Sequence, residues 1–134
     1  MENLGRGVVA LNQGEGKVWV GWRLLGTEPD EISFNVYRST DGGAPVKLNL
    51  APIHNVTFFQ DTGVDTTKTN TYTIRPVLDG KEGEPSKPFL GALKANTPVR
   101  QYIEVPLQVS PGYTPNDCSV GDLDGDGEYE IIVH

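Results

Sequence analysis

Short runs of alternating apolar and polar residues are the feature of this chain that most restricts its fold. They lie at 8–11, 17–24, 32–38, 46–50, 57–61, 71–77 and 88–93. Period-two alternation places successive side chains on opposite faces of a strand, and no stretch shows the 3.6-residue repeat of an amphipathic helix. Turn-forming sequences such as NQGEG, TDGG and LDGK separate the runs. The pattern therefore predicts an all-β fold with seven short strands in a β-sandwich.

The chain length and composition limit the remaining possibilities. The 134 residues are enough for one domain and part of a second. Because Cys118 is the single cysteine, the fold contains no internal disulfide. No apolar run approaches the roughly 18 to 20 residues that cross a bilayer as a helix, and the first residues do not form a signal peptide. We therefore expect no membrane contact.

Acidic residues are concentrated at the carboxyl end. The chain has 11 Lys and Arg against 18 Asp and Glu, a formal net charge of -7. Residues 117–134 contain six of the acidic residues and no Lys or Arg. No basic stripe is available for phosphates, which excludes nucleic acid as an expected partner. Like charges at this density repel one another, so a bound cation is expected among them.

The sequence GDLDGDGEYE at 121–130 has the spacing of a calcium-binding loop. It has carboxylates at the first, third and fifth loop positions, glycine at the sixth, and oxygen donors at the seventh and ninth. Hard oxygen ligands in this number favour calcium over magnesium. The predicted ligands are the side chains of Asp122, Asp124, Asp126 and Glu130 and the backbone carbonyl of Glu128. The alternative is an acidic turn that binds only water.

The context of this loop differs from that of an EF-hand. Val133 occupies the twelfth loop position, where an EF-hand has glutamate, and the IIVH that ends the chain is typical of a strand. We therefore predict a strand at 118–121, the loop, and a second strand at 129–133, as in a blade of a β-propeller. One blade cannot close a ring, so this end is expected to be the truncated start of a larger domain.

A linker and an extra strand are predicted between the sandwich and the loop. Residues 94–100 resemble a linker, which sets the expected boundary between domains at 1–95 and 96–134. Beyond it, Ile103, Val105, Leu107 and Val109 alternate as in a strand with one buried face. Pro106 lacks an amide donor, so this strand is expected at a sheet edge.

The sandwich region resembles a fibronectin type III, immunoglobulin-like domain. Trp22, Tyr37, the sequence FQDT at 59–62 and Tyr72 follow in the order found in that family. The resemblance implies that Trp22, Tyr37, Tyr72 and Ile74 are buried, and that the Tyr72 hydroxyl bonds back to the preceding loop as a tyrosine corner. Pro76 is expected to end the 71–77 strand or to bulge it.

Combined with YTPNDCSVGDLDGDGEYEIIV at 113–133, this β-domain resembles the amino-terminal part of rhamnogalacturonan lyases of polysaccharide lyase family 11. The resemblance implies a secreted or periplasmic parent enzyme with a calcium-binding propeller. That enzyme would cleave the rhamnogalacturonan-I backbone of pectin by β-elimination. The remaining blades of the same polypeptide would then be the structural partner of residues 96–134.

No catalytic residue is predicted within the chain itself. A lyase of this type needs a base and, usually, cations beside the uronate carboxylate. His54 and His134 have no neighbouring carboxylate or nucleophile in the sequence, so we expect the chain to be inactive alone. Asn116 and Asp117 precede the first blade strand and are candidate substrate contacts, with an Asx turn as the alternative. Two other hypotheses are a carbohydrate-binding or adhesion module at 1–95 and a non-enzymatic calcium-binding propeller.

Overall fold

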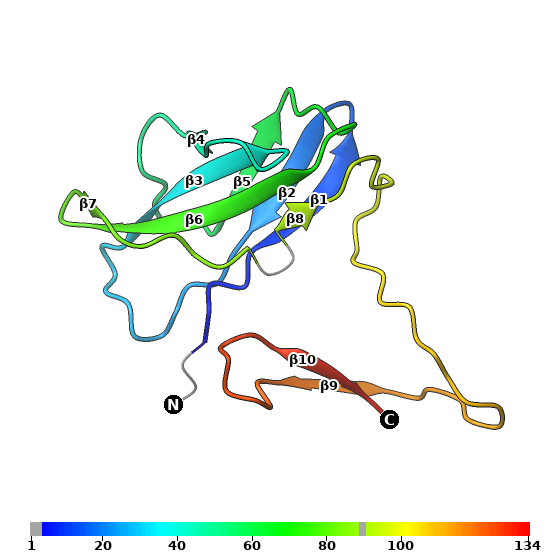
Figure 1. The fold of residues 1–134 in the computed structure, drawn as a ribbon. Coiled ribbons are helices and arrows are strands. Elements are labelled where there is room, and N and C mark those ends of the chain that lie inside the picture. The colour runs from blue at the N-terminus through cyan, green and yellow to red at the C-terminus, as the bar shows by residue number, and fades with distance from the viewer. Residues whose placement is uncertain (1–3, 89–90) are drawn as a thin grey trace.

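The computed structural model describes residues 4–88 and 91–134 and shows ten β-strands and no helix among them (Figure 1). No segment of the described part therefore forms a helix that could cross a membrane. The strands are β1 (Val9–Gly14), β2 (Lys17–Gly21), β3 (Ser33–Thr40), β4 (Val46–Lys47), β5 (Phe58–Thr62), β6 (Asn70–Leu78), β7 (Lys81–Glu82), β8 (Ala92–Leu93), β9 (Cys118–Gly121) and β10 (Glu130–Val133).

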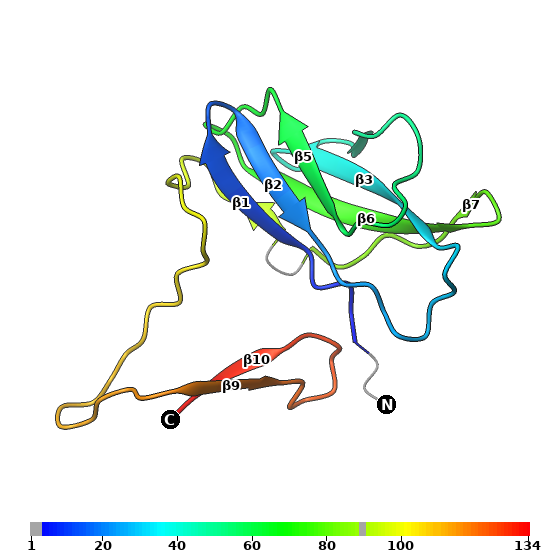
Figure 2. The same cartoon turned by 180° about the vertical axis from the view of Figure 1, so that it is seen from behind.

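Strands β1 to β8 form two antiparallel sheets that pack face to face (Figures 1 and 2). One sheet has the order β1-β2-β5, and the other has the order β4-β3-β6-β7, with β8 also pairing with β6. Both β7 and β8 are two residues long and lie along β6, which pairs on its other side with the full length of β3. The all-β, fibronectin type III-like sandwich predicted from the sequence is confirmed.

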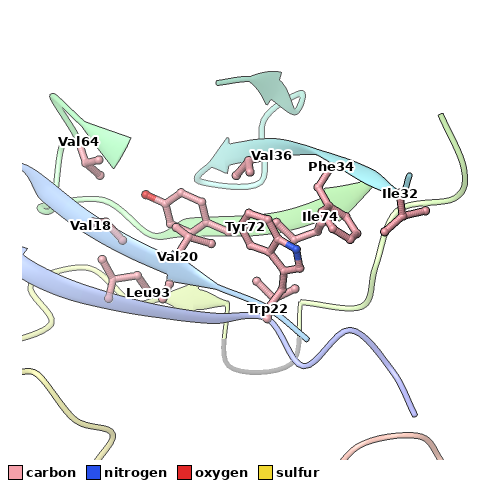
Figure 3. Close-up of a cluster of buried hydrophobic side chains, with 12 residues drawn as sticks. Val18, Val20, Trp22, Ile32, Phe34, Val36, Val64, Tyr72, Ile74 and Leu93 are labelled. Carbon is pink, nitrogen blue, oxygen red and sulfur yellow. The ribbon is translucent and has the colours of Figure 1, made fainter. Parts of the chain in front are cut away.

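The core lies between the two sheets (Figure 3). Alternation places Val18 and Val20 of β2 opposite Tyr72 and Ile74 of β6, and all four are fully buried. Just beyond β2, the Trp22 ring meets the Phe34 ring edge to face, with centroids 5.5 Å apart. The predicted burial of Trp22, Tyr72 and Ile74 is confirmed.

The prediction that Tyr37 is buried is wrong. Phe34 and Val36 of β3 are buried and face the core. Because successive side chains of a strand alternate between its faces, Tyr37 faces the other side. Its ring is on the outer face of the sheet, where the hydroxyl donates a hydrogen bond to Glu82 at 2.7 Å. The register of the strand, rather than aromatic character, decides the side chain's position.

Pro76 does not end or bulge its strand, contrary to the prediction. It pairs with Phe34 in the continuous ladder between β6 and β3. The Phe34 amide and carbonyl both bond to Ile53, on the other side of β3. This is a position of the antiparallel ladder that uses no hydrogen bond between the two strands. The missing amide of Pro76 therefore costs the β3–β6 ladder nothing.

The hydroxyl of Tyr72 bonds to a side chain and not to the preceding loop. It donates to Oδ2 of Asp61 in β5 at 2.9 Å, and Arg38 of β3 donates to the same oxygen at 2.6 Å. Burial, followed by the charge and hydrogen bond of Asp61, raises the pKa of Tyr72 well above its ordinary value. The predicted tyrosine corner is thus replaced by an Arg38–Asp61–Tyr72 cluster that joins the two sheets, with Asp61 and Tyr72 buried and Arg38 half-buried.

The Asn49 side chain lies along the edge of β3 between β4 and the Phe34–Ile53 bridge. Its Oδ1 accepts a hydrogen bond from the Val36 amide at 2.8 Å, and its Nδ2 donates to the carbonyl of Ala51 at 2.8 Å and to Oδ1 of Asn35 at 2.8 Å. Asn49 is buried. The Asn49 side chain therefore provides a hydrogen-bond acceptor for the Val36 amide, which no neighbouring strand pairs with.

The region after the sandwich differs in part from the prediction. Residues 103–109, all within the described part, form no strand, and Ile103, Val105, Leu107 and Val109 are exposed. The predicted extra strand is therefore absent, because this segment pairs with no other strand. Strands β9 and β10 do form an antiparallel hairpin, close to the predicted ranges (Figure 2).

Candidate metal centre

The acidic loop joins β9 to β10. The last residue of β9, Gly121, pairs with the first residue of β10, Glu130, so residues 122–129 form the closed turn of the hairpin. Gly125 and Gly127 have φ angles of 78° and 91°, in the region that favours glycine. Two of the glycines in the sequence motif thus permit the tight path of the loop.

Three of the predicted ligands converge. One carboxylate oxygen each from Asp122, Asp124 and Glu130 lies within 4.8 Å of the other two. Asp122 and Glu130 are half-buried at the base of the loop, and Asp124 is exposed at its tip. Three hard oxygen donors at this separation fit the ligand set that calcium prefers.

Backbone amides hold all three of these carboxylates in place. Asp124 accepts a hydrogen bond from the Asp126 amide at 3.1 Å. Asp122 accepts hydrogen bonds from the amides of Gly125 at 2.7 Å and Gly127 at 3.1 Å. Glu130 accepts one from the Leu123 amide at 2.7 Å. These bonds fix the side chains of Asp122 and Glu130 toward the interior of the turn. The charges that repel one another are therefore held together by the loop backbone.

The other two predicted ligands are the Asp126 carboxylate, which is outside the converging cluster, and the Glu128 backbone carbonyl. The Asp126 carboxylate accepts a hydrogen bond from the Glu128 amide at 2.8 Å, while its carbonyl accepts one from Nζ of Lys87 at 3.2 Å. Glu128 is buried, 6% exposed, and Oε2 of its carboxylate lies 3.6 Å from Nη1 of Arg23. Burial raises the pKa of Glu128, and the Arg23 charge opposes that rise. The predicted role of the Glu128 carbonyl stays a prediction.

The candidate substrate contacts continue the hairpin. Asn116 donates its backbone amide to the His134 carbonyl at 2.7 Å, and Asp117 accepts from the His134 amide at 2.9 Å. The side chains of Asn116 and Asp117 are exposed. Their backbones thus extend the ladder beyond β9 and β10, and a substrate contact by their side chains remains a prediction.

Sequence reasoning missed the residues of the sandwich that contact the loop. Arg23, which follows β2, places its guanidinium 4.4 Å from the centroid of the Tyr129 ring and pairs with Glu128. Gly5 donates its amide to the Gly127 carbonyl. These contacts join segments more than 100 positions apart, and no local sequence pattern marks them.

Comparison with known proteins gives three similarities. A family model described as the rhamnogalacturonan I lyases beta-sheet domain matches residues 1–90. The chain is 40% identical to the rhamnogalacturonan endolyase YesW of Bacillus subtilis over 143 aligned positions, and 37% identical to the rhamnogalacturonan exolyase YesX of the same organism. Each alignment covers 99% of this chain but 21% of the relative, so the chain spans about a fifth of these proteins' length.

Among solved structures, the chain is similar to a Fn3-like protein from Clostridium thermocellum. The two are 27% identical, with a TM-score of 0.49, and the match covers 63% of this chain and 84% of that one.

Proposed function

The chain belongs to the family of rhamnogalacturonan I lyase β-sheet domains, and we propose that it is part of a larger lyase that cleaves the rhamnogalacturonan-I backbone of pectin by β-elimination. The observation that carries this proposal is the 40% identity to a rhamnogalacturonan endolyase along 99% of the chain. The similarity extends beyond the sandwich into the acidic hairpin, which a stand-alone carbohydrate-binding or adhesion module does not explain.

We assign residues 1–95 to the β-sheet domain and residues 96–134 to a linker and the start of the catalytic propeller. The exposed apolar residues of the second region support this assignment. Ile103, Val105, Leu107 and Val109 alternate along one segment, and Ile131 and Val133 are exposed on β10. Contiguous apolar surface of this kind usually marks a face that another structure covers. The covering structure in this proposal is the rest of the same polypeptide.

The acidic loop is proposed to hold one calcium ion, which would neutralise its carboxylates and fix the turn between two blade strands. Asp122, Asp124 and Glu130 would bind it through side-chain oxygens that already converge. Asp126 and the Glu128 carbonyl would complete the ligand set. The role of this loop is structural, and the abstraction of the proton α to the uronate carboxylate is assigned to residues outside this chain.

Asn116 and Asp117 are kept as proposed substrate contacts, because they are exposed beside the first blade strand. The polymeric substrate also places the reaction outside the cytoplasm, so we propose that the parent protein is secreted or periplasmic. The relatives include one endolyase and one exolyase at similar identity. This segment therefore carries no information about the mode of cleavage.

The test uses the complete polypeptide that carries this chain. It is incubated with rhamnogalacturonan-I and, as a control, with homogalacturonan, and the ultraviolet absorbance of the unsaturated product is followed. We expect the complete polypeptide to release product from rhamnogalacturonan-I and not from homogalacturonan. We expect residues 1–134 by themselves to release no product from either polymer. No product from rhamnogalacturonan-I would refute the proposed activity. Product formed by the isolated chain would place the catalytic base within it.

A further inference from the structure

Residues of the sandwich contact the acidic loop at Gly127, Glu128 and Tyr129. Nη1 of Arg23 lies 3.6 Å from Oε2 of Glu128, and the Arg23 guanidinium lies over the Tyr129 ring at 4.4 Å. Arg23 also donates to the Gly5 carbonyl at 3.3 Å, which holds its side chain against the segment before β1. The acidic loop is thus attached to the sandwich through the Arg23 guanidinium, which the Gly5 carbonyl holds in place.

Glu128 shows that this contact is closely packed. Its side chain is buried, and neither carboxylate oxygen accepts a hydrogen bond from any described residue. A methyl group added to Gly5 would collide with Glu128 and also crowd the Gly127 carbonyl, which accepts the Gly5 amide. A buried carboxylate without hydrogen bonds is costly. The Arg23 charge is the compensation nearest to it, so the docked position of Glu128 depends on Arg23.

The docked residues and the proposed ligands occupy the same short loop. Glu128 presents its side chain to Arg23, while its backbone carbonyl is a proposed calcium ligand. Tyr129 lies beneath Arg23 and is followed directly by Glu130, one of the three converging carboxylates. A shift of the loop off the sandwich would therefore move the positions of at least two ligands.

We infer that Arg23 is a positioning residue for the calcium loop, and that calcium binding and docking of the loop on the sandwich stabilise each other. This inference rests on the calcium site of the proposed function. Thermodynamic linkage requires the coupling to act in both directions. Calcium should strengthen the attachment of the hairpin, and loss of the Arg23 contact should weaken calcium binding.

The sign of the effect separates this role from simple electrostatics. A positive charge close to a cation site repels the cation, so removal of Arg23 should tighten calcium binding if charge were its only contribution. If Arg23 holds the ligands in place, the same change should weaken binding. Arg75 provides a matched control, since it lies over the Tyr37 ring at 5.5 Å on the outer face of the other sheet.

The experiment is calorimetric calcium titration of the 134-residue chain and its variants. We expect Arg23→Gln to weaken calcium binding at least about fivefold, the lower end of typical coupling between sites. Arg75→Gln should leave the affinity unchanged or slightly tighter. Tyr129→Leu, which changes no charge, should also weaken binding, whereas Tyr129→Phe should retain it because the ring remains. Far-ultraviolet circular dichroism verifies that each variant keeps its β-sheet.

A second measurement tests the reciprocal effect. Saturating calcium should raise the unfolding midpoint of the wild-type sandwich, followed by the fluorescence of Trp19 and Trp22, and should raise it less in Arg23→Gln. Equal or tighter calcium binding in Arg23→Gln would overturn the inference while leaving the calcium site intact. Absence of calcium binding in the wild-type chain would refute both the calcium site and its coupling to Arg23. The proposed lyase activity would still be tested separately, by the assay of the complete polypeptide.

Discussion

Replacement of Tyr72 by phenylalanine removes one hydroxyl from the interior of the sandwich and conserves the volume of the ring. In the wild-type chain that hydroxyl donates to Oδ2 of Asp61 at 2.9 Å, in a fully buried position. A hydrogen bond to a charged group contributes about 1.5 to 3 kcal/mol. Arg38 still pairs with Asp61 in the variant, so the cost should stay below the roughly 3 to 5 kcal/mol of a broken buried ion pair.

We therefore expect Tyr72→Phe to lower the free energy of unfolding by about 2 kcal/mol at neutral pH, which is on the order of 10 °C in the unfolding midpoint of a domain of this size. The assay is urea denaturation followed by tryptophan fluorescence, since Trp22 is in the same core. A difference from wild type below about 0.5 kcal/mol, within the usual range of surface substitutions, would refute the assigned role of the cluster.

The same cluster predicts a pH dependence. Burial and Asp61 raise the pKa of Tyr72, so below about pH 10 the phenol is protonated in both states and its contribution to stability is complete. Above that pH the unfolded chain releases the proton first, and the free energy of unfolding falls by up to about 1.4 kcal/mol per pH unit. Tyr72→Phe should lose most of this slope. Tyr113→Phe is the control, because the Tyr113 side chain is exposed.

Two further changes test the core and the loop. Trp22→Ala should lower the free energy of unfolding by roughly 3 to 5 kcal/mol, as for other buried aromatic residues, while Trp19→Ala, on the opposite face of β2, should cost clearly less; equal losses in urea denaturation would contradict the assigned core. Asp124→Ala removes one of the three converging carboxylates and should weaken calcium binding at least tenfold, about 1.4 kcal/mol, in calorimetric titration. Equal calcium affinity in Asp124→Ala and wild type would leave the loop without a metal-binding role.

Local patterns predicted the strands well, because alternation reports directly on which side of a strand is buried. Val18, Val20 and Trp22 have the same parity and all face the core. The glycines and aspartates of 121–130 likewise predicted a turn between two strands, since both the backbone freedom of Gly127 and the convergence of Asp122 and Glu130 are properties of a short segment.

The wrong predictions concern contacts between distant segments. The Tyr72 hydroxyl could bond to the preceding loop or to β5, and only the packing of the two sheets brings Asp61 to it. The alternation at 103–109 is that of a strand, yet a strand also needs a pairing partner, and these residues pair with none of the described strands. Arg23 gives no sequence signal at all, because its partners Glu128 and Tyr129 lie at the other end of the chain.

The side-chain amide of Asn49 has a consequence for the behaviour of the protein in concentrated solution. An open strand edge is a template on which a strand from another molecule can add, and such growth leads to aggregation. β4 covers only two residues of β3. Beyond it, the Phe34 amide and carbonyl bond to Ile53, and the Val36 carbonyl accepts a hydrogen bond from the Leu48 amide. Because Asn49 occupies the Val36 amide between β4 and Ile53, an incoming strand meets no continuous row of free donors and acceptors there. The Asn49 side chain and the backbone of Leu48 and Ile53 together thus protect this edge of the sheet from intermolecular growth.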